Sequence, residues 1–287
     1  MKRIVNVVVL IVSFLLINSS CKKALEPAET VNTINQTDSL TTPLSEIPFP
    51  VNPFFNCDFT PEYGDSVLFV KTGISGDQYA YPVNSSIPKG TFLSWPGGLD
   101  IDAHTGAINL SNSQTGQRFS IGFIPDNSTD TCVSHLVIGG ASYMDSIYLL
   151  SASHKSALPY FNANTIAPNP CASGGCLFDY TNSAKLQGIT VDPKMGFIDL
   201  EKTMSHNPFG LIPFDGATIY TTIHYQLNDQ SNGAPEQIQV KLIYYYSRSN
   251  IPGSLISLIQ NRVIGITSDN GDGVPTRPPI IIITRVK

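Results

Sequence analysis

The chain has 287 residues, a formal net charge of −5 and only 14% charged residues, with 22 glycines, 21 prolines and 5 cysteines. The length allows one or two domains. A hydrophobic fraction of 41% is enough for a sizeable core, and the low charge, with no charge-rich polar tract, argues against a mostly disordered chain. The pI of about 5.5 and the lack of a basic cluster argue against nucleic acid as a partner, because phosphate contacts need concentrated Lys and Arg.

The first residues have the features of a secretory signal peptide. Residues 1–3 supply positive charge, and residues 4–17 are almost wholly apolar. This run is too short for a comfortable transmembrane helix, which needs about 20 apolar residues, and it fits a signal peptide over residues 1–20. The segment Leu-Ile-Asn-Ser-Ser-Cys at 16–21 resembles the lipobox of bacterial lipoproteins. The resemblance implies cleavage before Cys21 and lipidation of its thiol; the alternative is an ordinary signal peptide with an unrelated cysteine.

Residues 21–55 are expected to form the lipid anchor and a Pro- and Thr-rich tether, since they show no sustained periodicity. An edge strand over residues 47–55 is the alternative. The form Ser-Cys-Lys-Lys resembles lipoproteins of the Bacteroidetes type. In enteric bacteria, Asp after the cysteine retains lipoproteins in the inner membrane, and Lys22 stands there instead. The resemblance implies an outer-membrane lipoprotein, with the cell surface as one destination and the membrane as a partner through the lipid anchor.

From residue 56 onward the pattern is typical of β-structure. Short runs rich in β-branched and aromatic residues end in Gly, Ser, Asn or Pro, and turn residues separate them. The predicted strands lie at 66–70, 78–83, 118–123, 133–138, 218–227 and 237–246. Only Ser254 to Arg262 has apolar spacing compatible with a short amphipathic helix.

An internal repeat organises these strands. Residues 98–110 (GLDIDAHTGAINL) align without a gap with residues 188–200 (GITVDPKMGFIDL), at an offset of 90 residues. In each copy an aspartate begins a tight turn by accepting backbone amides, and a glycine supplies a positive φ. These turn residues are Asp102, Gly106, Asp192 and Gly196. The second copy is expected to carry extra residues around 205–215.

The repeat resembles the immunoglobulin-like, cadherin-like domains of bacterial surface proteins, whose signature is roughly G-L-x-[IV]-D-x-x-T-G-x-I. The first copy keeps the signature, whereas the second departs from it at Ile189 and Met195. The resemblance implies an all-β fold with two tandem immunoglobulin-like β-sandwiches, over residues 56–140 and 141–250. Residues 251–287 are a C-terminal extension or added strands, and the pattern does not choose. Such domains are spacers or binding modules, so the repeated turn is expected to be structural.

Four cysteines remain after Cys21, and beyond the inner membrane they should be oxidised. Four cysteines allow three pairings, which the sequence alone does not decide. We favour Cys57–Cys132, which would join the entry of the first sandwich to its last strand, and Cys171–Cys176, which would close a small loop. A metal or redox pair is the alternative for that loop, although a lone C-x4-C is weak evidence for zinc.

Motifs of catalysis and metal binding are lacking in the sequence. The five histidines are isolated, and there is no H-E-x-x-H, G-x-S-x-G or P-loop. His104 beside Asp102 lies in the repeat turn, whose second copy has Lys194 there, so turn formation explains it. Residues 269–273 (DNGDG) hint at a calcium loop, but Pro279 stands where its bidentate Glu should be. We therefore predict no catalytic residue, no metal and no cofactor.

Three Asp-Ser tripeptides with an aliphatic third residue begin at Asp38, Asp65 and Asp145. They match the O-glycosylation pattern of Bacteroidetes, which is short enough to arise by chance.

Trp95, Tyr244 and Tyr246 are candidate stacking residues for a ligand, since aromatic faces suit sugar rings; packing in the core is the alternative. The sequence favours a non-enzymatic envelope lipoprotein that acts in adhesion, in the capture of a glycan or an envelope protein, or in a surface assembly. A pure structural spacer and a carbohydrate-processing hydrolase are the alternatives. The hydrolase would use acids on the loops, namely Asp179, Asp199, Glu201 or Asp215.

Overall fold

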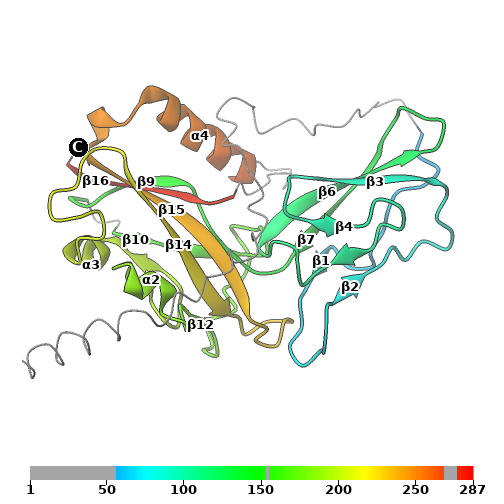
Figure 1. The fold of residues 1–287 in the computed structure, drawn as a ribbon, viewed down its shortest axis with the longest axis horizontal. Helices are drawn as coiled ribbons and strands as arrows, with labels where there is room; N and C mark the ends of the chain where they lie inside the picture. The colour runs from blue at the N-terminus through cyan, green and yellow to red at the C-terminus, as the bar shows by residue number, and fades with distance from the viewer. Residues whose placement is uncertain (1–55, 153–154, 268–276, 287) are drawn as a thin grey trace, which may run out of the picture. The chain divides into compact units, whose positions relative to one another are not determined.

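The computed structural model describes residues 56–152, 155–267 and 277–286. The predicted signal peptide, Cys21 and the tether therefore lie outside the described residues. All described residues belong to one compact unit, residues 43–287. The unit is mostly β-strand with few helices, as the sequence predicts (Figure 1). Within the described ranges, no helix has both the length and the apolar character needed to cross a membrane.

The first half of the unit contains two small sheets. Its strands are β1 (Val67–Leu68), β2 (Tyr79–Ala80), β3 (Gly90–Trp95), β4 (Asp100–Ile101), β5 (Ile108–Asn109), β6 (Gln117–Pro125) and β7 (Cys132–Ile138). One sheet has the order β1-β7-β6-β3 and the other has the order β2-β5-β4. β1 runs parallel to β7, and the remaining pairs are antiparallel. Both sheets contribute side chains to one core, which includes Phe92, Ile108 and Phe123.

The second half contains a five-stranded sheet. Its elements are β8 (Ala141–Tyr143), β9 (Ser146–Leu149), β10 (Ser156–Ala157), β11 (Pro159–Phe161), β12 (Leu177–Phe178), α2 (Ser183–Leu186), β13 (Ile198–Asp199), α3 (Leu200–Ser205), β14 (Ala217–Gln226), β15 (Glu236–Ser247), η2 (Arg248–Asn250), α4 (Gly253–Thr267) and β16 (Ile280–Val286). The sheet has the order β12-β14-β15-β16-β9, and β10 pairs with β13 and β11 with β8.

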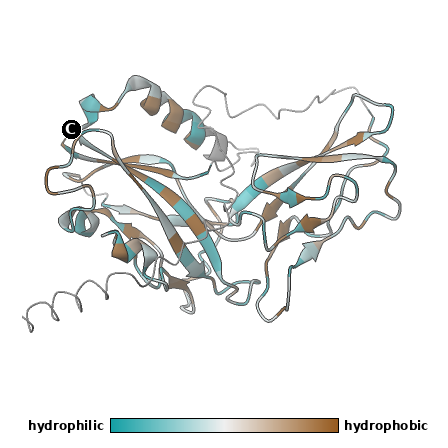
Figure 2. Cartoon of the chain, viewed as in Figure 1, coloured by the Kyte–Doolittle hydropathy of each residue, from teal (hydrophilic) through white to brown (hydrophobic). Residues whose placement is uncertain are grey.

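Burial alternates along β14 and along the first half of β15, as the sequence predicts for these strands. Hydrophilic and hydrophobic residues follow one another along both strands (Figure 2). On one face of the sheet, Ile223 and Val240 pack in a large core with Ile198 and Leu200 of the second repeat. On the other face, Ile243 and other apolar side chains form a smaller core against α4. The period of two marks the part of the sheet that has one exposed face, whereas residues 242–245, which are covered on both faces, are buried without alternation.

The C-terminal segment 251–287 adds both a helix and a strand. α4 covers the helix expected over 254–262, and it packs Ile259 and Leu255 against the sheet. β16 then enters the sheet between β15 and β9 and runs parallel to both. Residues 280–283 are four isoleucines, each at most 3% exposed. The last strand thus lies inside the sheet, a position that the sequence pattern leaves open.

The two repeat turns have the same local structure. The side chain of Asp102 accepts the amides of His104 (3.0 Å) and Thr105 (2.7 Å). The side chain of Asp192 accepts the equivalent amides, those of Lys194 (2.9 Å) and Met195 (2.7 Å). The glycines that follow have φ angles of +70° at 106 and +74° at 196. The turn that the repeat predicts is therefore present in both halves.

Each turn is also held by a tyrosine and a phenylalanine. The hydroxyl of Tyr63 donates to the carbonyl of Gly106 at 2.6 Å, and the hydroxyl of Tyr143 donates to that of Gly196 at 2.5 Å. A Cβ added at Gly106 would lie 2.6 Å from the Phe92 ring, and one at Gly196 would lie 2.5 Å from the Phe178 ring. Glycine is therefore required twice, by the φ angle and by the ring against it.

Candidate binding groove beside β1

An open groove lies where the edges of the two sheets of the first half meet. It has a volume of about 410 Å³. β1 and the residues around it form one wall, and the segment that leads into β2 forms the other. The lining residues are Asp65, Val67, Leu68, Phe69, Lys71, Ile74, Asp77, Gln78, Tyr79, Leu110 and Gln230.

β1 presents a free backbone edge to this groove. The carbonyls of Ser66 and Leu68 accept the amides of Val137 (2.8 Å) and Gly139 (2.7 Å) from the β7 side. Alternate residues of a strand direct their backbone groups to opposite sides. The amide and carbonyl groups of Val67 therefore face away from β7. Because β1 is the last strand of its sheet among the described residues, no strand of that sheet lies on this side.

The opposite wall is fixed by its own hydrogen bonds. The amide of Lys71 donates to Oε1 of Gln78 (2.8 Å), and Nε2 of Gln78 donates back to the Lys71 carbonyl (2.7 Å). The Gln78 carbonyl accepts the amide of Leu110 (2.8 Å), and Thr72 donates its amide to the Ser231 carbonyl (3.1 Å). The segment from 71 to 78 is thus braced at both ends, so the groove exists before a ligand arrives.

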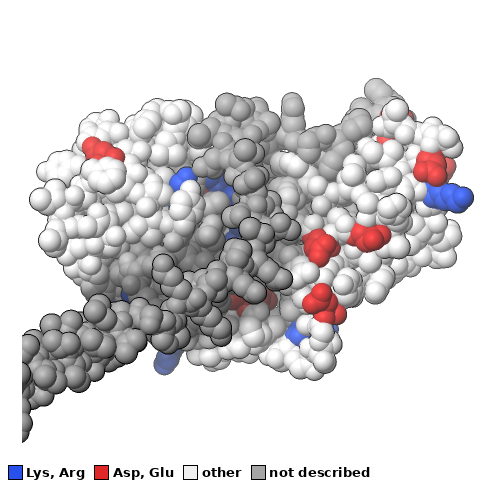
Figure 3. Space-filling model, in the orientation of Figure 1, with Lys and Arg blue, Asp and Glu red and all other residues white. Residues whose placement is uncertain are grey.

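Apolar and charged side chains share the rim of the groove. Ile74 is 53% exposed and Tyr79 is 49% exposed. The Tyr79 ring lies 6.3 Å from the Tyr81 ring, between centroids. Asp77 accepts a hydrogen bond from Nδ2 of Asn109 (2.9 Å), which holds its carboxylate at the rim. On the face of the molecule that Figure 3 shows, the charged side chains that are visible are few and stand apart from one another.

The stacking residues predicted from the sequence do not come together here. Tyr244 is only 2% exposed, and its ring packs 5.9 Å from that of Phe209, so it is a core residue. Trp95 is half-buried on β3, and Tyr246 is 56% exposed on β15, in a different sheet. Tyr244 therefore has the core packing given as the alternative: Tyr244 and Tyr245 belong to the cores on opposite faces of the sheet, and both are buried. The exposed pair Tyr79 and Tyr81 was missed, although the two stand two apart in a predicted strand.

The acids proposed for a hydrolase all have structural partners. Asp179 accepts the amides of Ala184 and Lys185 at the start of α2, and Asp199 accepts that of Lys202 at the start of α3. Glu201 forms an ion pair with Lys155 at 2.8 Å, and Asp215 accepts the Tyr246 amide. Asp179 and Asp199 thus stabilise the starts of helices, whereas Glu201 and Asp215 bind side-chain or backbone groups of other elements.

One histidine does meet a serine. Nδ1 of His224 lies 2.9 Å from the Ser183 hydroxyl and 2.8 Å from that of Thr181. The Ser183 hydroxyl donates to the carbonyl of Thr222 at 3.0 Å, so it is oriented toward the backbone. The cluster fastens α2 to β14. His104 stays in its repeat turn, as the sequence predicts.

A buried polar cluster lies away from the groove. The Tyr225 hydroxyl lies 2.7 Å from that of Thr115 and accepts the Ala141 amide at 3.0 Å. Arg277 donates to the Thr115 carbonyl and, at 3.2 Å, to Oε1 of Gln117. Glu236 is 6% exposed, and its burial raises the pKa of the carboxyl to about 8. A carboxyl that stays protonated near neutrality costs less to bury than a carboxylate, which explains how the cluster tolerates it.

A second buried group is an ion pair. Asp145 and Arg262 are both nearly inaccessible, with 3.3 Å between Oδ2 and Nε. Asp145 also accepts the Ile280 amide at 2.5 Å, at the start of β16. Burial raises the pKa of Asp145 to about 6, and Arg262 opposes the rise. The pair fastens α4 and β16 to the residues before β9.

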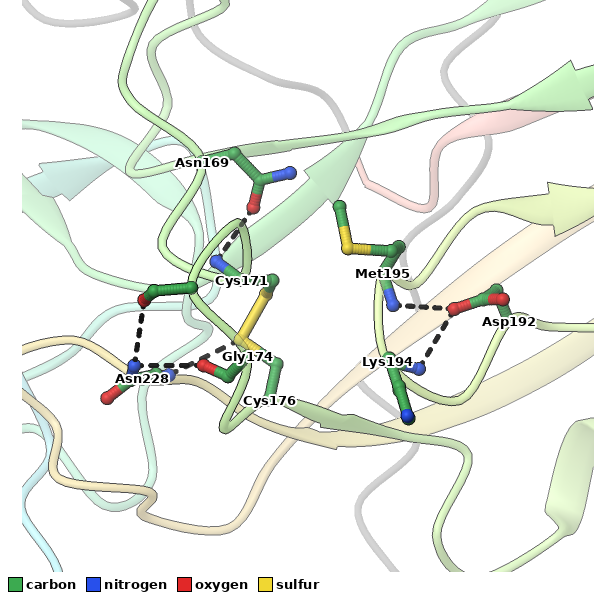
Figure 4. The surroundings of a disulfide bond; sticks show 9 residues. Asn169, Cys171, Gly174, Cys176, Asp192, Lys194, Met195 and Asn228 are labelled. Atoms are coloured by element: carbon green, nitrogen blue, oxygen red, sulfur yellow. Dashed lines mark hydrogen bonds between the residues drawn. A yellow bond between two sulfur atoms is a disulfide. The ribbon is translucent and has the colours of Figure 1, made fainter.

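Both disulfides have the pairing favoured from the sequence. Cys57 bonds to Cys132 across 75 residues, and Cys171 bonds to Cys176 across five. In Figure 4 the smaller loop lies beside the second repeat turn, and Asn228 donates to the Gly174 carbonyl at 2.9 Å. Phe178, two residues after Cys176, donates its amide to the Pro193 carbonyl. The small disulfide therefore braces the turn, a structural use.

Metal binding has no candidate among the described residues, where no three His, Cys, Asp or Glu side chains lie together. The calcium-like residues 269–273 lie outside the described ranges.

Comparison with known proteins identifies no relative by sequence. No protein-family model matches the chain, and no curated protein matches it. Among solved structures, it is similar to the EC1-2 fragment of chicken VE-cadherin, with 7% identity, a TM-score of 0.21, and coverage of 62% of this chain and 98% of that one. It is also similar to a tri-modular endo-β-1,4-glucanase from Bacillus licheniformis, with 12% identity, a TM-score of 0.18, and coverage of 62% and 37%.

Proposed function

We propose that the protein is a non-enzymatic binding module of the cell envelope, which captures its partner in the groove beside β1. In this proposal Cys21 carries the lipid that anchors the chain to the outer membrane, and residues 21–55 lift the folded unit away from the bilayer. Several acyl chains would hold it there firmly, at about 0.8 kcal/mol for each buried methylene.

The proposal includes a fold of two tandem immunoglobulin-like sandwiches. In support, the first half has a four-stranded and a three-stranded sheet around one core, the strand numbers of a seven-stranded sandwich. The second half repeats the order of its elements: β9, β10, β12, β13, β14 and β15 occupy the places of β1, β2, β3, β5, β6 and β7. The Tyr–Gly–Phe contacts around the two repeat turns support the same correspondence.

The observation that carries the proposed activity is the groove itself. It lies between two sheet edges, its far wall is braced, and its rim exposes Ile74 and Tyr79. Apolar side chains with a few polar groups at a preformed concavity are typical of binding sites. The acids that a hydrolase would need are engaged in caps and ion pairs instead, which is why binding is favoured over catalysis.

The experiment compares groove variants on an array of immobilised glycans and envelope proteins. Ile74→Lys places a charge in the groove at an exposed position, so the fold should persist. Ile212→Lys is the matched control, since Ile212 is 92% exposed and is not among the lining residues. We expect Ile74→Lys to abolish capture and Ile212→Lys to leave it unchanged. Capture of no ligand, or equal capture by both variants, would refute the proposal.

The anchor is tested separately. Cells that express Cys21→Ala should release the protein from the membrane fraction and process its leader differently. A variant that is cleaved identically and stays membrane-bound would show that Cys21 is not the anchor.

A further inference from the structure

We infer that the loop between α3 and β14 docks the second half on an anionic lipid bilayer, with the tip of the loop among the acyl chains. The tip consists of Leu211, Ile212 and Phe214, which are 86%, 92% and 71% exposed. This inference goes beyond the proposed function, because it concerns how the folded unit meets the membrane and not what the groove captures.

The first argument is that the fold does not account for the apolar character of the loop. Residues 207–214 contain no charged residue, and the loop, yellow in Figure 1, extends beyond the sheet. In the correspondence between the two halves, residues 110–116 join β5 to β6 and residues 200–216 join β13 to β14. The first half thus makes the equivalent connection without such a loop. Clustered apolar side chains that the fold leaves exposed mark a contact with a partner or a membrane.

The base of the loop is fastened to the sheet, which keeps the tip exposed. The Phe209 ring packs 5.9 Å, between centroids, from the ring of the core residue Tyr244. The carboxylate of Asp215 accepts the amide of Tyr246 at 2.5 Å and Nδ2 of Asn250 at 2.6 Å. The chain is therefore held on both sides of the tip, by an apolar and by a polar contact. A tip that is already ordered loses little conformational freedom on docking.

A tyrosine and two arginines lie around the base of the loop. Tyr246, whose amide binds the base, is 56% exposed. Arg248 follows it in η2, and Arg285 lies on β16 between the partners of Tyr245 and Ser247. Both arginines are exposed. An apolar tip above a tyrosine and cations suits a bilayer, because acyl chains lie deepest and Tyr and Arg are favoured at the level of the headgroups.

The charges of the two halves favour the same orientation. Residues 56–140 contain eight Asp and Glu against three Lys and Arg, whereas residues 141–287 contain ten of each. An anionic surface therefore repels the first half and lets the second half approach, within a screening length of about 10 Å at 0.1 M salt. A protein partner that held only the tip would give no reason for this difference between the halves, whereas an anionic bilayer does.

The proposed lipid on Cys21 allows this contact and remains the main attachment. Residues 21–55 span at most about 120 Å, which limits how far the folded unit can leave the bilayer and sets no smallest distance. Even a whole myristoyl chain binds a bilayer only marginally and reversibly. Three side chains therefore orient the folded unit without replacing the lipid, and a Cys21→Ala chain is still expected to leave washed membranes.

The test measures flotation with vesicles of phosphatidylethanolamine and phosphatidylglycerol. The protein is the mature chain with Cys21→Ala, so that no acyl chain contributes. Ile212→Asp places a carboxylate at the tip. Ile166→Asp is the matched control, since Ile166 is 89% exposed between β11 and β12 and the net charge changes equally.

We expect Ile212→Asp to lower the partition coefficient at least about tenfold, the effect of one apolar side chain that is no longer buried. Ile166→Asp should lower it less than about twofold, because a charge away from the bilayer is screened. Vesicles of phosphatidylcholine alone should bind the chain about fivefold more weakly, the effect of one arginine at an anionic surface.

A tryptophan at the tip supplies a readout of depth. Phe214→Trp combined with Trp95→Phe leaves a single tryptophan, whose fluorescence should be quenched by lipids with brominated acyl chains. Absence of vesicle binding, equal binding by the two Asp variants, or no quenching would overturn bilayer docking. A dimer in gel filtration that Ile212→Asp dissociates, without vesicle binding, would identify a second copy of this chain as the occupant instead. Because the groove does not include the loop, each of these results leaves the proposed function to its own array test.

Discussion

Replacing Glu236 by glutamine should change how stability depends on pH. Glu236 is 6% exposed in the cluster of Tyr225, Thr115 and Arg277. Burial raises the pKa of its carboxyl from 4.5 to about 8. In the unfolded chain the group releases its proton near its ordinary pKa, whereas the folded chain keeps it. The folded state therefore loses stability from this group as the pH rises from about 4.5 to about 8.

The size of the effect follows from the two pKa values. A shift of one unit corresponds to about 1.4 kcal/mol. Between pH 5 and pH 7, the titration of Glu236 should lower the free energy of unfolding by about 2.5 kcal/mol. Glutamine has nearly the same shape and does not titrate, so the Glu236→Gln chain should lose none of this. The free energy of unfolding of the variant, relative to that of wild type, should increase as the pH rises. This difference should stop growing above about pH 8.

Urea denaturation at a series of pH values between 4.5 and 8.5 measures the difference. Glu201→Gln serves as the control, because Glu201 is exposed in its ion pair with Lys155 and an exposed pair contributes about 1 kcal/mol or less. Its curve should run parallel to that of wild type. Burial also raises the pKa of Asp145. Because Asp145 titrates equally in all three chains, its contribution to the free energy of unfolding cancels in the comparison. If the Glu236→Gln curve also runs parallel to wild type, the buried carboxyl does not hold its proton and the reasoning is wrong.

Three further predictions concern stability. Gly196→Ala places a Cβ 2.5 Å from the Phe178 ring at a φ of +74°. Thermal unfolding should show that the free energy of unfolding falls by about 3 kcal/mol. An unchanged melting temperature would contradict the clash. Cys57→Ser opens a loop of 75 residues, which should cost about 4–5 kcal/mol in the chain-entropy model; equal denaturation midpoints for variant and wild type would argue that the loop is closed by other contacts. Deleting residues 280–286 removes the inner strand of a sheet, so gel filtration and circular dichroism should show an expanded, non-cooperative chain, and a compact monomer with cooperative unfolding would falsify this.

The sequence predicts those parts of the fold that local patterns determine. The alternation in 218–227 and in the first half of 237–246 identifies β14 and β15, because every second residue is buried there. The repeated Asp and Gly identify both turns, since a turn is a property of a few consecutive residues. The apolar spacing after residue 253 identifies α4 for the same reason.

The sequence does not predict features that depend on distant partners. Four consecutive isoleucines indicate a buried strand, but their place between β9 and β15 is a matter of long-range pairing. Tyr244 and Tyr246 stand on the same face of a strand by spacing, yet one is 2% and the other 56% exposed, since Tyr246 lies near the end of β15. Aromatic residues near the end of a strand therefore need the structure to separate core from surface.

The candidate site was the least accessible to sequence reasoning. Its walls come from the residues around β1, the 71–78 segment and Leu110, which no short motif joins. A signal was nevertheless present: the Asp65 and Asp145 tripeptides follow equivalent tyrosines, and aligning them as a second repeat would have paired β1 with β9. Free backbone edges leave no mark on the sequence, because any residue can supply an amide and a carbonyl.

The position of β16 also sets the order in which the chain can finish folding. The first half has all of its strands once residue 138 has been made. In the second sheet Ser146 pairs with Ile281, so this sheet forms only after residues 280–286 have been made. Before β16 is made, β9 and β15 have unpaired backbone edges, which can pair with wrong strands. A chain cut short near its C-terminus would keep the first half and be unable to close the second. The second sheet is therefore complete only when residues 280–286 lie between β9 and β15.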